Sequence, residues 1–166
     1  MILSAQSIRQ RCQCNPPLID PFVERTMSPG GNSFGLGPAS YDVRLDQRLV
    51  LPPHGFTLAS TLERFSMPAD LAGVVRGKST WARDGISVFN TLLDPGWSGF
   101  LTLEIVNHLQ DEIIIAAGEP IAQIEFEMLD LPTEQPYGFN DTGKYQNQER
   151  GPQPARREMA NRYDEF

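Results

Sequence analysis

Residues 40–51 read SYDVRLDQRLVL, and apolar and polar residues alternate along this stretch with a period of two. Such alternation is typical of a strand that buries one face of a sheet. Further strand-like runs follow, separated by turns rich in Pro and Gly: GFTLAS, ERFSMPADLAGVVRG, ISVFNTLL, FLTLEIVN, EIIIAAG and IAQIEFEML. Short strands with a turn about every 8–12 residues are typical of an all-β sandwich or barrel.

The sequence on either side of this strand-rich region has a different pattern. Ser4 followed by AQSIRQRC predicts a short N-terminal helix, with Ser4 as its N-cap and Ile8 on its buried face. MSPGGNSFGLGP, residues 27–38, is rich in Gly and Pro and predicts a loop. A short helix is expected around residues 79–84. The apolar periodicity ends after Leu131, so we expect a β-barrel domain over residues 1–131 and a C-terminal tail over 132–166.

Length and charge exclude several classes of protein. The chain has 166 residues, which favours a single domain with one core. Its net charge is 14 − 21 = −7, so binding of nucleic acid through a broad positive groove is not expected, and any phosphate site must be built locally. It contains no apolar run of about 18 residues and no signal peptide pattern. We therefore expect a soluble protein of the cytoplasm, or of the host cytoplasm if a phage encodes it.

Cysteine and histidine are too few and too poorly spaced to predict a zinc site. Cys12 and Cys14 are one residue apart, whereas His54 and His108 are distant from them and from each other in the sequence. Structural zinc usually takes four ligands, and catalytic zinc takes three and a water. Two free thiols are the expected state of the cysteines.

Three polar stretches are candidates for chemistry. RGKSTWARDG, residues 76–85, combines three cations with two hydroxyls after an apolar strand, and either binds phosphate or is a solvated charged turn. In LLDPGWSGFLTLEIVN, residues 92–107, Asp94 opens a turn, and alternation places Glu104 on one face with Phe100 and Thr102. Glu104 faces solvent, or it is partly buried with a raised pKa suited to proton transfer.

The third stretch is GKYQNQERGPQPAR, residues 143–156, with Tyr137 a little upstream. Its composition favours a disordered tail. The functional alternative is a lid that closes over a ligand and brings Lys144 and Gln148 to the anionic end of that ligand.

Taken together, these stretches resemble the dCTP deaminase family of the trimeric dUTPase-like superfamily. GKSTWARDG is similar to the family's phosphate-binding motif, DPGWSGFLTLE to its catalytic motif, and KYQNQERGP to its closing segment. The resemblance implies a distorted β-barrel or jelly-roll-like fold and a homotrimer with active sites between subunits. The implied reaction is zinc-independent deamination of dCTP to dUTP and ammonia, which supplies dUTP for thymidylate synthesis. The zinc deaminase signature H-x-E…P-C-x-x-C is absent from the sequence.

The resemblance also implies roles for individual residues. Glu104 is expected to deprotonate the attacking water and to protonate the departing amine, with support from Ser79 and Arg83. Asp94 is expected to accept from the deoxyribose 3′-hydroxyl, and residues Thr102, Leu103 and Glu104 to contact the pyrimidine. The phosphates are expected to lie near Lys78, Ser79, Thr80 and Arg83, with Tyr137, Lys144 and Gln148 contributed by the tail. Mg²⁺ would be held by phosphates and water rather than by protein.

The sequence leaves three questions open. Asn90 stands where family members commonly have Ala, which leaves base preference and inhibition by dTTP undecided. The Gly-rich segment 29–37 has no assigned role. The alternatives are a dUTPase or bifunctional enzyme that releases dUMP and pyrophosphate and, from another class, a non-catalytic nucleotide-binding regulator.

Overall fold

The computed structural model describes residues 1–141 and 143–156, and its mainly β architecture confirms the expected fold class. One sheet has the order β1 (Ile19–Asp20), β6 (Phe56–Ser66), β10 (Ser98–Asn107) and β8 (Ile86–Val88). A second sheet has the order β2 (Thr26–Met27), β3 (Ser33–Leu36), β4 (Tyr41–Arg44), β12 (Pro120–Met128), β7 (Leu71–Gly77) and β9 (Leu92–Leu93). The short strands β5 (Leu49–Leu51) and β11 (Ile113–Ile115) pair with each other.

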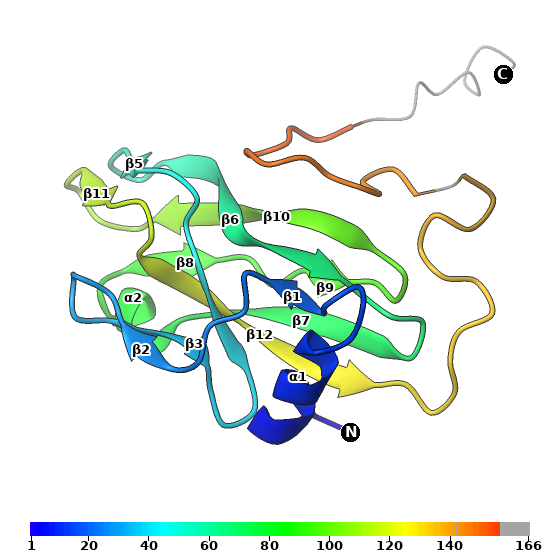
Figure 1. Cartoon of the computed structure of the whole chain (residues 1–166). Coiled ribbons are helices and arrows are strands. Elements are labelled where there is room, and N and C mark those ends of the chain that lie inside the picture. The colour runs from blue at the N-terminus through cyan, green and yellow to red at the C-terminus, as the bar shows by residue number, and fades with distance from the viewer. Residues whose placement is uncertain (142, 157–166) are drawn as a thin grey trace, which may run out of the picture.

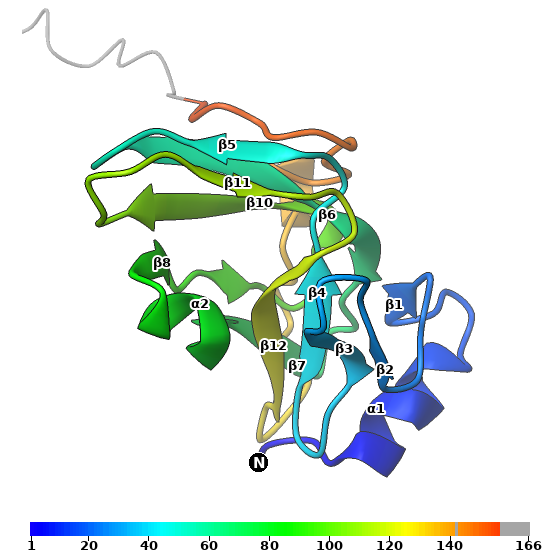
Figure 2. The same cartoon turned by 90° about the vertical axis from the view of Figure 1, so that its left-hand side faces the viewer.

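The sheets curl around one apolar core and form a distorted barrel. Figure 2 shows β6 and β10, covered by β5 and β11, above the layer that contains β4, β7 and β12. Alternate residues of β10 face the core, so Leu103 and Ile105 are fully buried, as are Ile124 and Phe126 of β12. The predicted alternation in residues 98–107 is therefore confirmed, and it leaves Glu104 on the outer face of the sheet.

Both predicted helices are present. α1 (Ala5–Cys12) follows Ser4 and buries Ile8, although the Ser4 hydroxyl lies 3.3 Å from that of Ser7 and does not cap the helix. α2 (Ser79–Arg83) follows β7 and contacts β8. A 3₁₀ segment covers Phe139–Asp141. Across the described part of the chain, no helix has the length and apolar character needed to cross a membrane.

Two local expectations were wrong. The stretch 40–51 forms two strands, because β4 joins the six-stranded sheet whereas β5 pairs with β11. The Gly-rich segment 27–38 contributes Met27 to β2 and contains all of β3. Gly35 has φ +85°, and a Cβ there would lie 2.6 Å from the carbonyl oxygen of Glu24, so this glycine lets the segment before β2 pack closely against β3.

The Gly-rich segment is also anchored to the barrel. The buried carboxylate of Glu119 accepts hydrogen bonds from the Ser28 hydroxyl at 2.8 Å and from the Gly30 backbone N–H at 2.9 Å. The Asn32 side-chain amide donates to the same carboxylate at 3.3 Å. These contacts give the segment a structural role that its composition did not reveal.

The described part of the tail lies against the barrel, in contrast to the disorder that its composition favours. After β12 the chain rises along one side of the molecule and returns across β6 and β10 (Figure 1). The Phe100 N–H donates to the Gln148 carbonyl at 2.9 Å, and the Trp97 indole N–H donates to the Tyr145 carbonyl at 2.8 Å. The predicted tail also includes residues 142 and 157–166, which lie outside the described residues.

Candidate active site

A cavity of about 750 Å³ opens between β10, β6, the segment around β9 and the tail. Its walls combine apolar side chains with a small number of carboxylates, amides and a lysine, which is the usual character of a small-molecule site. The lining residues are Phe56, Leu58, Thr91, Leu92, Leu93, Asp94, Trp97, Leu101, Thr102, Glu104, Tyr137, Lys144, Tyr145, Gln148, Gln153, Pro154 and Ala155.

Glu104 lies on the β10 wall of this cavity between apolar neighbours. Its partner across the β6 pairing is Leu58, and on the other side its carbonyl accepts from the Phe89 N–H at 2.9 Å. Burial raises the pKa of the Glu104 carboxyl above its usual range. Among the described residues, no other side chain forms a hydrogen bond or ion pair with this carboxylate. The structure thus places Glu104 in the partly buried environment that suits proton transfer.

Asp94 reaches the same cavity from the turn after β9. The turn is closed by the hydrogen bond from the Trp97 N–H to the Asp94 carbonyl, 3.0 Å long, as the Asp-Pro-Gly sequence predicts. Partial burial raises the pKa of the Asp94 carboxyl. Trp97 is itself buried and is bound to the tail through its indole N–H, so the turn and the tail are held together.

The tail supplies the remaining polar wall. Gln148 pairs with Gly99 as an isolated parallel bridge, and its side-chain amide donates to the Thr102 hydroxyl at 2.5 Å. The Gln153 N–H donates to the same hydroxyl at 3.0 Å. Gly99 has φ +149°, and a Cβ there would lie 2.7 Å from the Gln148 backbone nitrogen, so only glycine lets the tail approach this closely.

The cavity brings together six of the residues that the sequence singled out. They are Asp94, Thr102, Glu104, Tyr137, Lys144 and Gln148. Leu103 is different, because its side chain is fully buried in the core and it does not line the cavity. The α2 residues Ser79, Thr80 and Arg83 are exposed and do not line the cavity. α2 lies beside β8 and away from the tail (Figures 1 and 2).

Lys78 also lies outside the cavity, and its ammonium has a partner within the chain. Its Nζ lies 2.6 Å from Oδ2 of Asp42, and the side chains are only 10% and 7% exposed. A phosphate at Lys78 would have to compete with this buried ion pair. The pair fixes the end of β7, where α2 begins, against β4.

Replacing Asp42 by alanine is expected to lower the free energy of unfolding by about 3–5 kcal/mol, because a buried ammonium is left without its partner. Denaturant unfolding at neutral pH measures this loss. The double variant Asp42→Ala, Lys78→Met should recover most of it. A loss below about 1 kcal/mol, the range of exposed ion pairs, would show that the pair is solvated.

Sequence reasoning missed the apolar walls of the cavity. Phe56, Leu58 and Leu92 belong to strands that were recognised, but their periodicity indicates only that they are apolar. Trp97 and Tyr145 lie in stretches that were singled out for their polar residues. Phe56 and Phe89 are more than half exposed, with ring centroids 6.5 Å apart, and this exposed apolar pair became visible only in the folded chain.

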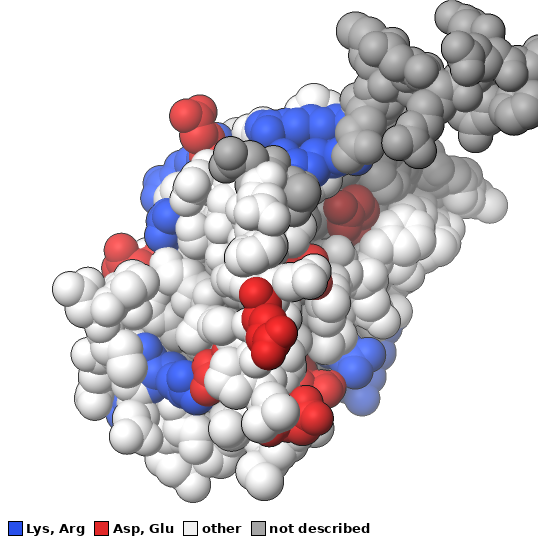
Figure 3. All heavy atoms as spheres, turned by 90° about the vertical axis from the view of Figure 1, so that its right-hand side faces the viewer, with Lys and Arg blue, Asp and Glu red and all other residues white. Residues whose placement is uncertain are grey.

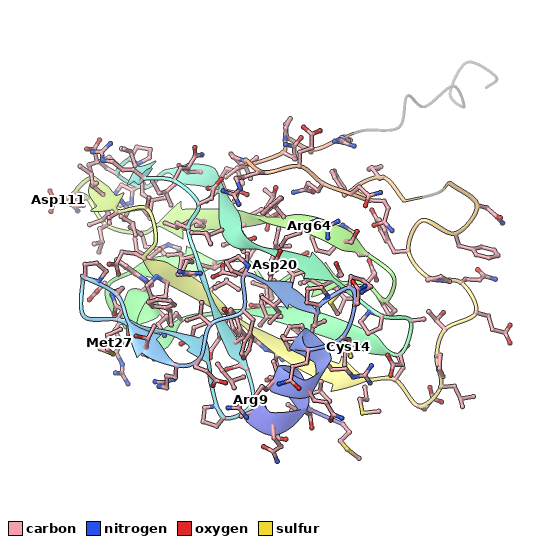
Figure 4. All side chains as sticks on the ribbon, in the orientation of Figure 1. Arg9, Cys14, Asp20, Met27, Arg64 and Asp111 are labelled. Carbon is pink, nitrogen blue, oxygen red and sulfur yellow. The ribbon has the colours of Figure 1, made fainter. Side chains whose placement is uncertain are left out.

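The described residues contain no group of three or more His, Cys, Asp and Glu side chains arranged to hold a metal ion. Cys12 is partly buried, and burial raises the pKa of its thiol to about 11. Cys14 follows the end of α1, on the surface (Figure 4). The face beside the tail shows scattered acidic and basic groups on a mostly uncharged surface (Figure 3).

Solved structures place this architecture among the dUTPase-like folds. A mutant dUTPase of phage phi11 of S. aureus aligns with 69% of this chain and 92% of that chain, with a TM-score of 0.55 and 17% identity; its structure is described with a structural Mg(II) ion. The 2′-deoxycytidine 5′-triphosphate deaminase of Agrobacterium tumefaciens aligns with 77% of this chain and 48% of that chain, with a TM-score of 0.62 and 18% identity.

Sequence comparison identifies one family among the proteins with this fold. A family model described as dCTP deaminase-like matches residues 42–129. The dCTP deaminase of Thermococcus sibiricus is 36% identical over 143 residues, covering 82% of this chain and 88% of the relative. A "dCTP deaminase, dUMP-forming" of Mycobacterium ulcerans is 36% identical over 191 residues, covering 94% and 95%. The chain belongs to the dCTP deaminase family.

Proposed function

We propose that this protein is a hydrolase that converts dCTP and water to dUTP and ammonia. The observation that carries the proposal is Glu104, a carboxylate with a raised pKa on the apolar wall of a nucleotide-sized cavity. One group that acts first as a base and then as an acid works best when its pKa approaches neutrality. The curated relatives named dCTP deaminase support the choice of substrate.

Glu104 supplies the proton transfers in this reaction. A water attacks C4 of the cytosine, and its first proton passes through the Glu104 carboxylate to ring N3. The hydroxyl proton of the resulting tetrahedral intermediate then passes through the same carboxyl to the amino nitrogen. The C4–N bond breaks, ammonia leaves, and the C4 carbonyl of uracil remains. Glu104 ends the cycle ionised, as it began.

The other cavity residues orient the substrate. Asp94 accepts from the deoxyribose 3′-hydroxyl, and the backbone of β10 at 102–104 contacts the pyrimidine edge. Tyr137, Lys144 and Gln148 approach from the tail, where the Lys144 ammonium attracts the triphosphate. A pyrimidine nucleotide is thereby held between the two carboxylates of the cavity and the tail.

A second copy of the chain completes the site. Ser79, Thr80 and Arg83 carry the hydroxyls and the cation of the phosphate motif, yet they lie outside the cavity of their own chain. Phe56, Phe89 and Leu92 form an exposed apolar surface at the cavity, 53–57% exposed each, which suits burial against another subunit. We infer a homotrimer in which α2 of one subunit faces the cavity of the next, with Ser79 and Arg83 near the reacting base and water.

Magnesium enters with the substrate. Mg²⁺ is usually held by phosphate oxygens and waters, with few protein carboxylates. This fits a cavity in which two carboxylates, Asp94 and Glu104, are assigned to the sugar and the base. The substrate is therefore the magnesium complex of dCTP, and the reaction takes place in the cytoplasm, where nucleotides are interconverted.

Incubation with dCTP and Mg²⁺, followed by chromatography and an ammonia assay, tests the proposal. Equimolar dUTP and ammonia are the expected products. Binding of dCTP without turnover would support the regulatory alternative instead. Adding dTTP to the same assay shows whether the end product inhibits.

A second candidate activity has one observation in its favour. The M. ulcerans relative that covers 94% of this chain is named as dUMP-forming. An enzyme that also hydrolyses the α–β phosphate bond would release dUMP and pyrophosphate. The chromatogram separates dUMP from dUTP, and incubation with dUTP alone shows whether the second step occurs independently of deamination.

A further inference from the structure

The pairing of β6 with β10 is interrupted beside the cavity. Phe100 lies opposite Arg64, whereas Thr102 lies opposite Ser60. Three residues of β6, 61–63, therefore stand opposite the single residue Leu101 of β10. Regular antiparallel strands would keep the two counts equal, and a bulge of this kind redirects side chains next to it. The extra residues are in β6, so β10 keeps its alternation: Leu101 is buried and Thr102 is on the outer face, and both border the cavity.

Thr61 fills this interruption with its side chain. Its hydroxyl accepts from the Leu101 backbone N–H at 3.0 Å and donates to the Glu63 carbonyl at 2.8 Å. Thr61 is fully buried. The hydroxyl therefore satisfies two backbone groups at the point where the regular pairing is broken, and it fixes the position of β10 between Phe100 and Thr102.

The position of Thr102 matters to the tail. The Thr102 hydroxyl accepts from the Gln148 side chain and from the Gln153 backbone N–H, so it is the point at which the tail meets β10 inside the cavity. Two residues further along the strand, Glu104 faces the same cavity. A shift of β10 at residue 101 would therefore displace both the tail, which binds Thr102, and the Glu104 carboxylate in the cavity.

We propose that Thr61 is a positioning residue for the deaminase site, which acts through Leu101 and Thr102 to place the tail over the substrate. This inference rests on the proposed function, because its activity test measures the deamination of dCTP. Thr61 touches neither the cavity nor, by this account, the substrate. A displacement of about 1 Å far from the chemistry can cost about 100-fold in rate.

The test replaces Thr61 by valine, which keeps the shape and removes the hydroxyl, and Thr57 by valine as the matched control. Thr57 lies in the same strand, and its hydroxyl donates to the Val50 carbonyl at 3.5 Å, remote from the bulge. We expect Thr61→Val to lower kcat about 10–100-fold at a temperature where the protein stays folded. Thr57→Val should retain wild-type kcat.

If Thr61→Val does not fold, a second pair of variants tests the role of the hydroxyl. Thr61→Ser and Thr61→Ala both lose the methyl group and differ only in the hydroxyl, so Ser should restore kcat and Ala should not. Amide hydrogen exchange of Leu101 gives a readout that does not depend on activity, and its protection should fall with Val or Ala but not with Ser.

A positioning role also predicts that the effects are not additive. In the Gln148→Ala background, where the tail has lost the side-chain one of its two hydrogen bonds to Thr102, Thr61→Val should reduce kcat by a smaller factor than in the wild type. Equal factors in both backgrounds, or wild-type kcat in folded Thr61→Val, would overturn the inference. Failure of the wild type to deaminate dCTP would instead refute the proposed function, and the exchange of Leu101 would still test the role of the hydroxyl.

Discussion

Replacing Glu104 by glutamine is expected to lower kcat for ammonia release from dCTP by about 10²–10⁴-fold, the range that a positioned acid or base contributes. Glutamine has nearly the same size as glutamate but can neither take the proton from water nor return it to the amine. Steady-state assays with dCTP and Mg²⁺ measure the loss. The KM should change far less, because the substrate contacts assigned to Asp94 and the tail are unaltered.

Glu112→Gln is the matched control, because it makes the same chemical change at an exposed position in the turn before β11. It should keep wild-type kcat. Wild-type turnover in Glu104→Gln would exclude this carboxylate as the proton carrier and leave Asp94 as the remaining candidate in the cavity.

The same substitution is expected to stabilise the fold at neutral pH. Burial raises the pKa of Glu104 in the folded state, so the folded chain holds this proton more tightly than the unfolded chain does. Stability therefore falls as pH rises from the unfolded pKa, about 4.3, through the raised folded pKa. Glutamine does not titrate, so the stability advantage of Glu104→Gln should be absent near pH 4 and present near pH 7.5. Denaturant midpoints at the two pH values measure it, and an advantage that grows toward acid pH would contradict the environment assigned to Glu104.

The sequence was sufficient to predict the strand-rich architecture and most of one wall of the site. Alternation in residues 98–107 placed Glu104 and Thr102 on one face, and the Asp-Pro-Gly signal placed Asp94 in a turn. Both predictions depend on local rules, because side-chain direction in a strand and turn formation are set by neighbouring residues. The sequence did not predict whether Glu104 is buried, because that depends on Leu58 and the tail, which are distant along the chain.

Other features could not be predicted from local sequence patterns either, because they also depend on residues that are distant along the chain. The ion pair between Lys78, which follows β7, and Asp42 of β4 joins residues that are 36 positions apart, and no spacing rule connects them. The bulge at Thr61 depends on how β6 and β10 align, which no pattern within either strand specifies. The tail lacks apolar periodicity, yet its backbone pairs with β10 at Gly99, a contact that composition alone does not predict.

Mixing two inactive variants is expected to restore activity if α2 of one subunit serves the cavity of another. Glu104→Gln removes the base from the cavity wall, and Arg83→Ala removes the cation from α2, so each homotrimer is inactive. In mixed trimers, a site is complete when an Arg83→Ala chain supplies the cavity and its neighbour, a Glu104→Gln chain, supplies α2. Random assembly from equal amounts gives about a quarter of wild-type activity.

The control for this experiment mixes Ser79→Ala with Arg83→Ala. Both changes lie on α2, so every site in a mixed trimer still lacks one of the two groups, and activity should stay at the level of the separate variants. Co-refolding the two chains and isolating the trimer by size-exclusion chromatography ensures that exchange has occurred. Recovery in the first mixture but not in the second requires Arg83 and Glu104 to act from different chains. No recovery in verified mixed trimers would mean that α2 serves the cavity of its own chain. In that case a movement within one subunit would have to bring α2 to the cavity.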